Sequence, residues 1–133
     1  MSQENVEVVR RVYEHFDATH TADLERLAPN VVWDLSNFES WPERPLYEGH
    51  EGVQEFIGDW LEPWDTYEHD LEALHDAGDD VVAIVHVSGT ASMSGAAVEM
   101  RVGHVWALID GTVVRATFYS DPAKALEAAG VSE

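Results

Sequence analysis

The segment VEMRVGHVWALIDGTVVRATFY, residues 98–119, decides the fold. Its centre, Asp110-Gly111, is a strong signal for a tight hairpin turn, because both central positions of such a turn favour residues that tolerate positive φ. β-branched and aromatic residues flank the turn on both sides, which is typical of two paired strands. The segment therefore predicts an antiparallel hairpin formed by residues 98–109 and 113–119.

Two earlier segments extend this hairpin into a larger sheet. Residues 81–88 form a nearly continuous β-branched run after the turn residues 77–80, and residues 67–75 alternate weakly between apolar and polar side chains. Together with the hairpin, they predict a four-stranded antiparallel meander.

The first half of the chain has the period of helices, with apolar residues at three- and four-residue steps. The elements expected outside the meander are a helix over 2–18, a short helix from Thr21 that Pro29 ends, a strand over 31–35, an aromatic loop over 36–45, a helix between Gly49 and Pro63, and a closing helix over 123–129 capped by Asp121. Helices therefore precede and follow the predicted sheet.

These elements predict a single α+β domain over residues 1–133. Its N-terminal helices should cover one face of a strongly curved antiparallel sheet and enclose one cone-shaped pocket. Because residues 81–87 are apolar on both faces, the second face should be covered too, most simply by another subunit. We therefore expect a homodimer formed through the sheet.

Composition excludes several classes of partner. The chain has 26 acidic residues against 7 basic ones, a formal net charge of −19. Such a field repels phosphate backbones and anionic lipid heads, so neither nucleic acid nor a membrane is an expected partner. Cysteine is absent, which removes thiolate chemistry. The polar, acidic start lacks the features of a leader peptide, and the expected location is the cytoplasm.

Asp34 and Tyr13 are the first two candidates for chemistry. Asp34 ends an apolar strand, where burial favours a carboxylate that takes up protons; the alternative is an Asp that caps the loop backbone. Tyr13 lies on the apolar face of the first helix, where its hydroxyl can reach into the cavity. Its alternative is core packing with a satisfied hydroxyl.

Two histidines on predicted strands are the next candidates. His104 lies among apolar side chains, either as a desolvated pocket group or as a core histidine with one hydrogen bond. His86 interrupts the apolar run and could share the cavity with His104. Both could join Asp34 in a two-His-one-carboxylate metal site, but no histidine pair has the short spacing of a metal motif. We therefore expect neither a metal nor another cofactor.

Aromatic side chains are more numerous than a small core needs, with five Trp, four Tyr and four Phe, which indicates a roomy apolar cavity. The residues expected to line it are Phe16, Trp33, Phe56, Trp60, His86, Met100, Val102, Trp106 and Phe118. The expected occupant is a small apolar molecule.

Several short motifs, spread over nearly the whole chain, carry a family resemblance. They are VYEHF (12–16), ADLERL (22–27), VVWD (31–34), YEGHEGV (47–53), HVWALIDG (104–111) and FYSD (118–121). In this order they resemble the SnoaL-like branch of the nuclear transport factor 2-like (NTF2-like) superfamily, which also includes ketosteroid isomerases, polyketide cyclases and limonene epoxide hydrolases. The resemblance implies the cone-shaped, cystatin-like α+β fold.

The resemblance also implies roles for the candidate residues. By similarity to the isomerases, Asp34 is the expected general base and Tyr13 the expected oxyanion donor. The chain departs from the isomerases at His104, where they carry a protonated Asp, and this departure puts steroid-type isomerisation in doubt. The implied function is acid/base isomerisation, cyclisation or hydrolysis of a small molecule. The alternative is a non-catalytic module for ligand binding or dimerisation.

Overall fold

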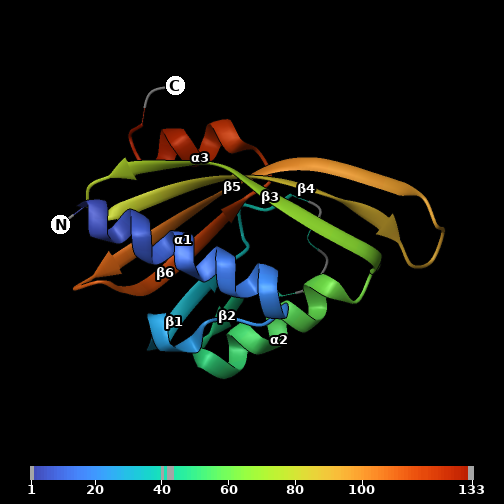
Figure 1. The fold of residues 1–133 in the computed structure, drawn as a ribbon, viewed down its shortest axis with the longest axis horizontal. Helices are drawn as coiled ribbons and strands as arrows, with labels where there is room; N and C mark the ends of the chain where they lie inside the picture. The colour runs from blue at the N-terminus through green and yellow to red at the C-terminus, as the bar shows by residue number, and fades with distance from the viewer. Residues whose placement is uncertain (1, 40, 42–43, 132–133) are drawn as a thin grey trace.

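A six-stranded sheet forms the frame of the protein in the computed structural model, which describes residues 2–39, 41 and 44–131 (Figure 1). The helical elements are α1 (Ser2–Thr19), the 3-10 turn η1 (Leu24–Arg26), α2 (Gly49–Leu61) and α3 (Pro122–Ala128). The strands are β1 (Leu27–Asp34), β2 (Leu46–Glu48), β3 (Trp64–Ala77), β4 (Asp80–Ala91), β5 (Ala97–Ile109) and β6 (Thr112–Tyr119).

The strands follow one another across the sheet in the order β2-β1-β6-β5-β4-β3. From β3 to β6 each strand pairs antiparallel with the next, which confirms the predicted meander. Asp110 and Gly111 both have positive φ, 51° and 76°, as the expected hairpin turn requires. β1 pairs parallel with β6, so the sheet is mixed and not wholly antiparallel as predicted.

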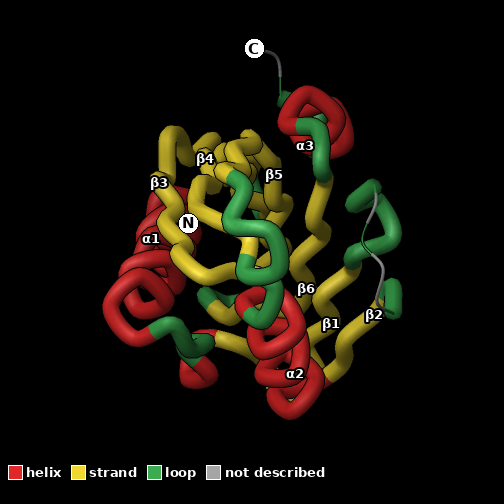
Figure 2. The backbone as a smooth tube through the Cα atoms, turned by 90° about the vertical axis from the view of Figure 1, so that its right-hand side faces the viewer, coloured by secondary structure: helices red, strands yellow, loops and turns green. Residues whose placement is uncertain are grey.

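Helices cover both faces of this curved sheet. Figure 1 shows α1 and α2 on one side and α3 on the other, and Figure 2 shows the strands curling around the side that holds α1 and α2. Register shifts within β3 and between Ala107 and Leu108 mark places where a strand bends. The predicted α+β cone is confirmed, with its concave face under α1 and α2.

α3 covers part of the outer face of the sheet. Ala125 and Leu126 of α3 pack with Val82 and Ile84, which the alternation of β4 turns away from the concave face. Gly103 makes this contact possible, because a Cβ there would lie 2.6 Å from the Cβ of Ala125. α3 thus accounts for the two-sided apolar pattern of β4 without a second subunit, and the homodimer stays a prediction.

The start of α3 matches the expected cap. The side chain of Asp121 accepts a hydrogen bond of 3.0 Å from the backbone N–H of Ala123, and Pro122 occupies the first turn. This confirms Asp121 as the N-cap of the closing helix.

The segment around Pro29 differs from the prediction. The expected short helix is only the single turn η1, and β1 begins at Leu27 instead of Val31. Pro29 is tolerated in a strand here because regular pairing with β6 is interrupted between Leu27 and Val32. The three-residue strand β2 was not predicted, because its pairing with β1 depends on contacts outside its own short sequence.

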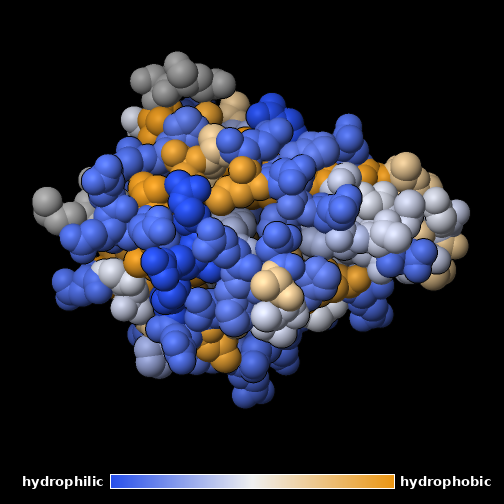
Figure 3. Space-filling model, viewed as in Figure 1, coloured by the Kyte–Doolittle hydropathy of each residue, from blue (hydrophilic) through white to orange (hydrophobic). Residues whose placement is uncertain are grey.

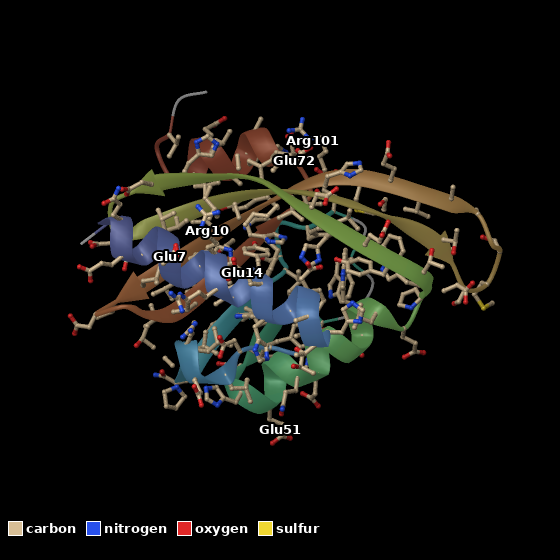
Figure 4. All side chains as sticks on the ribbon, in the orientation of Figure 1. Glu7, Arg10, Glu14, Glu51, Glu72 and Arg101 are labelled. Atoms are coloured by element: carbon tan, nitrogen blue, oxygen red, sulfur yellow. The ribbon has the colours of Figure 1, made fainter. Side chains whose placement is uncertain are left out.

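The exterior is strongly hydrophilic. Figure 3 shows hydrophilic side chains over most of the face seen in Figure 1. Figure 4 shows labelled charged side chains on the outside of α1, α2 and the sheet, including the pair Arg101 and Glu72, whose Nε and Oε1 atoms lie 2.7 Å apart. Within the described residues, no helix combines the length and the apolar character needed to cross a membrane.

Candidate ligand-binding cavity

A cavity of about 80 Å³ lies between the concave face of the sheet and the helices α1 and α2. The predicted pocket residues found on its wall are Tyr13, Phe16, Trp33, Phe56, Trp60, Val102, His104, Trp106 and Phe118. They come from α1, α2 and strands of the inner face. The wall is mainly aromatic and aliphatic, so the few polar atoms on it determine which ligand groups it can accept.

Tyr13, His104 and Trp106 form a hydrogen-bonded cluster on this wall. The indole Nε1–H of Trp106 donates to the hydroxyl of Tyr13 over 2.9 Å. The same hydroxyl lies 2.5 Å from Nδ1 of His104. α1 provides Tyr13 from the helical side, and alternation along β5 turns His104 and Trp106 to the same inner face. The inward-facing residues of α1 and of β5 therefore come together at one place on the cavity wall.

Burial keeps this cluster uncharged. Burial lowers the pKa of His104 to about 3, so its imidazole is neutral at pH 7. Burial also raises the pKa of the Tyr13 hydroxyl well above 10, although the hydrogen bond from Trp106 acts in the opposite direction. The cavity therefore presents neutral hydrogen-bonding groups.

The neutral cluster has one more donor than it uses. If Nδ1 of His104 accepts from Tyr13, the proton of the imidazole is on Nε2 and has no partner in the cluster. If Nδ1 instead carries the proton and donates, the hydroxyl of Tyr13 accepts twice and its own O–H is unused. In either tautomer one N–H or O–H is left for a ligand oxygen.

Trp33 supplies a second unused donor. Its side chain lines the cavity, the residue is 5% exposed, and its indole Nε1–H has no hydrogen-bond partner among the described residues. The ring centroids of Phe56 and Phe118 lie 5.6 and 5.3 Å from that of Trp33. These rings have no lone pair that could accept the indole N–H. A buried donor without a partner is costly, and this nitrogen has almost no exposed surface, so the cost falls on the fold.

His69 is a cavity residue that the sequence analysis missed. It lies on β3, is partly buried, and stacks on Phe16 with ring centroids 5.2 Å apart. The alternation of Tyr67, His69 and Leu71 was the available signal, since these three share one side of the strand. The alternation of this strand was judged weak because polar residues separate these three positions.

Asp34 does not lie on the cavity wall, contrary to the prediction. Alternation in β1 turns Trp33 inward and Asp34 outward, where its Oδ2 lies 2.5 Å from the guanidinium of Arg115. Its Oδ1 accepts from the backbone N–H and the hydroxyl of Ser36, over 2.9 and 2.6 Å. This is the alternative arrangement, an Asp that caps the loop backbone.

The electrostatics of Asp34 also differ from those of a base. Burial raises the pKa of the carboxyl, but the hydrogen bonds from Ser36 and the pairing with Arg115 outweigh it, and the net shift lowers the pKa below 3.8. A carboxylate held in this way is a weaker base than an ordinary Asp.

His86 and Met100 also lie outside the cavity. His86 is on the outer face of β4, with its Nε2 3.3 Å from the carboxylate of Glu99. The prediction was wrong about its side because residues 81–87 are apolar at nearly every position, which hides the inward face. Asp34, His86 and His104 therefore do not converge on a metal site, and the described residues contain no group of three potential ligands that could hold a metal ion.

Met100 belongs to a second hollow at the mouth of the cavity. This outer groove has a volume of about 220 Å³. It is lined by Phe38, Trp41, Trp60, Pro63, Trp64, Ala91, Val98 and Met100. Phe38 and Trp60 line both hollows, so groove and cavity are neighbours. Phe38 and Trp41, from the segment after β1, pack against Trp60 of α2.

The fold and the site define a class: an α+β cone with an apolar cavity on the concave face of its sheet. The SnoaL-like domain family matches residues 9–116, and the chain belongs to this family. No curated protein matches the chain in sequence.

Solved structures show the same fold. An NTF2-like protein from Burkholderia thailandensis is 29% identical, with a TM-score of 0.74 over 92% of this chain and 96% of that one. A putative SnoaL-like polyketide cyclase from Jannaschia sp. is 22% identical, with a TM-score of 0.73 over 98% of this chain and 94% of that one. TerC, crystallised with polyporic acid, is 20% identical, with a TM-score of 0.71 over 96% of this chain and 98% of that one.

Proposed function

We propose that the protein binds a small apolar molecule in the cone cavity and holds an acceptor oxygen of that molecule with the cluster of Tyr13, His104 and Trp106. The observation that carries the proposal is the unused donor of this neutral cluster in a mainly apolar wall. A carbonyl or ether oxygen fits these groups better than an anion, because the described cavity wall holds no Lys or Arg.

The same cluster supports acid/base chemistry. A donor aimed at a carbonyl oxygen stabilises the negative charge that develops there when a neighbouring C–H bond breaks. One such donor is worth about 3–4 kcal/mol of transition-state stabilisation in known enzymes. The proposed reactions are therefore isomerisation, cyclisation or hydrolysis of an apolar carbonyl compound, without a cofactor.

Structural neighbours support a small-molecule role. One is described as a putative SnoaL-like polyketide cyclase, one as a putative isomerase from Bacillus subtilis, and one was crystallised with polyporic acid. Their identities to this chain are 20–22%, so the proposal relies on the cavity of this protein and not on their activities.

Binding of indane and of 2-indanone, measured by calorimetry, tests the proposal. The two molecules have nearly the same shape, and only 2-indanone has a carbonyl oxygen. We expect 2-indanone to bind about 3- to 10-fold more tightly, as one net hydrogen bond predicts. Replacing both Tyr13 and His104 by Phe removes the unused donor in either tautomer and should remove most of this preference.

Tyr47→Phe is the matched control for this experiment. Tyr47 is buried and donates to the carboxylate of Asp59 over 2.9 Å, but it does not line the cavity. This variant should keep the preference for the ketone. Equal affinity of the wild type for indane and 2-indanone would contradict the proposal.

A ligand-binding protein without turnover is the second candidate. The position of Asp34 favours it, because the carboxylate expected to act as the base faces Arg115 instead of the cavity. Turnover of a bound ketone separates the two candidates. The cytoplasmic location and the homodimer remain predictions under either one.

A further inference from the structure

His69 is the one group on the described cavity wall, outside the cluster of Tyr13 and His104, that can take up a proton near neutral pH. Its ring centroid lies 6.1 Å from that of Tyr13 and 6.0 Å from that of Tyr67. Within the described part of the chain, neither ring nitrogen has a hydrogen-bond partner. A neutral imidazole in this state offers one unused lone pair to the cavity.

The surroundings of His69 favour the neutral form at rest. Burial is the largest effect and lowers the pKa of His69 below 6.5. The negative charges of Asp17 and Asp70 act in the opposite direction, and His20 adds to the lowering. Tyr13, Tyr67 and His104 also face it and are uncharged at pH 7. The two carboxylates remain near enough to stabilise an imidazolium that forms during a reaction.

We propose that His69 is the general base of the cavity, which removes a proton from the carbon next to the carbonyl group that the Tyr13 and His104 cluster holds. This inference rests on the proposed function and names its substrate class, an apolar enolisable ketone. Tyr13 lies between the two groups, in contact with the rings of both His69 and His104. The oxygen and the adjacent carbon of one small ketone can therefore meet the donor and the base together.

The step is balanced without a co-reactant. The C–H bond breaks, and its electron pair forms a C=C bond while the π electrons of C=O move to the oxygen. The proton goes to the free ring nitrogen of His69, and the oxygen gains the hydrogen bond from the cluster. If the proton on His69 is replaced by a solvent deuteron before it returns to the same carbon, the ketone is labelled, and return to another carbon gives an isomer.

Deuterium exchange into 2-indanone, followed by NMR in D₂O, tests this step. The wild type should accelerate exchange at the carbons next to the carbonyl, above the rate in buffer alone. His69→Gln should slow the enzymatic rate by about 100-fold or more, the usual contribution of a general base. Its Kd for 2-indanone should stay within about threefold of the wild-type value. His86→Gln, on the outer face, is the matched control and should keep the wild-type rate.

The pH dependence of the wild type gives a readout that needs no variant. Exchange should rise with pH up to the lowered pKa of His69 and stay level above it, because only the neutral imidazole accepts a proton. A wild type that binds 2-indanone but does not exchange it, or a His69→Gln variant with the wild-type rate, would overturn the role of His69 and leave the binding proposal intact. Failure to bind 2-indanone would overturn both.

Discussion

His104 and His86 lie on neighbouring strands of one sheet, yet they stand in opposite environments. His104 faces the concave side, is partly buried among aromatic rings and hydrogen-bonds Tyr13. His86 faces the outer side, where it pairs with the exposed Glu99. The same contrast separates Trp33 from Asp34, which follow one another in β1. The side of the sheet therefore decides whether a polar residue can meet a ligand or only stabilise the surface.

The largest effect should come from removing an inner-face residue. Trp106→Ala deletes a 2% exposed indole that packs on Trp33 and Phe118 and donates to Tyr13. We expect the free energy of unfolding to fall by about 3–5 kcal/mol in urea titrations. On the outer face, Arg101→Ala removes an exposed ion pair with Glu72 and should cost less than about 1 kcal/mol. If both variants lost a similar free energy of unfolding, the two faces of the sheet would not differ as described.

The inner-face His104 should also make stability depend on pH. Because the pKa of His104 falls from 6.5 to about 3 on folding, the unfolded chain binds a proton that the folded state does not. Stability from this group is complete above pH 6.5 and falls as the pH drops towards 3, by up to about 1.4 kcal/mol per pH unit.

Urea midpoints between pH 7 and pH 5 measure this slope. His104→Gln should flatten it markedly. An unchanged slope in the His104 variant would show that its imidazole is not buried in the neutral form.

Two glycine-to-alanine substitutions should change stability in opposite directions, Gly103→Ala against α3 on the outer face and Gly58→Ala on the exposed side of α2. Gly103→Ala places a Cβ 2.6 Å from that of Ala125 and 3.0 Å from the Cα of Pro122, so α3 must shift, and the expected cost is about 1–3 kcal/mol. Gly58→Ala lies in α2 with no atom within 4 Å of the new Cβ and should stabilise by about 0.5–1 kcal/mol. Thermal unfolding of both variants checks the signs, and a neutral Gly103→Ala would show that α3 does not pack closely on the sheet.

Asp34→Asn should weaken the fold without changing the cavity. It removes the charge that pairs with Arg115, at an expected cost of about 1–3 kcal/mol at pH 7. Since the pKa of Asp34 is lowered on folding, its contribution is complete above pH 4 and is lost as the pH falls through the lowered value. The affinity for 2-indanone should stay within about twofold. A large loss of affinity for 2-indanone would show that Asp34 contributes to ligand binding after all.

The spacing of apolar residues predicted which side chains of α1 and β5 face the cavity. It did so because in these two elements the pattern fits only one orientation. Helical spacing placed Tyr13 on the inner side of α1, and alternation placed His104 with Trp106. Both statements depend on neighbours within one element, and the structure brings the three residues together.

Most of the missed features depend on contacts between elements. The inward side of β4 is set by its register, in which Ala83 faces His104, and its apolar run carries no sign of this. Asp34 points outward because alternation along β1 turns its neighbour Trp33 inward, a local signal that was overlooked; only its pairing with Arg115 depends on the parallel contact between β1 and β6, which no local pattern encodes. The packing of α3 on the outer face of the sheet was not predicted. Its apolar face is short, and it can contact the sheet only because Gly103 has no side chain at that place.

A crystal structure of the protein with 2-indanone tests the central claim most directly. The account predicts the ligand in the inner cavity, with its carbonyl oxygen within about 3.2 Å of the Tyr13 hydroxyl or of Nε2 of His104. A ligand bound only in the outer groove or on the outer face of the sheet, with its oxygen in solvent, would contradict it.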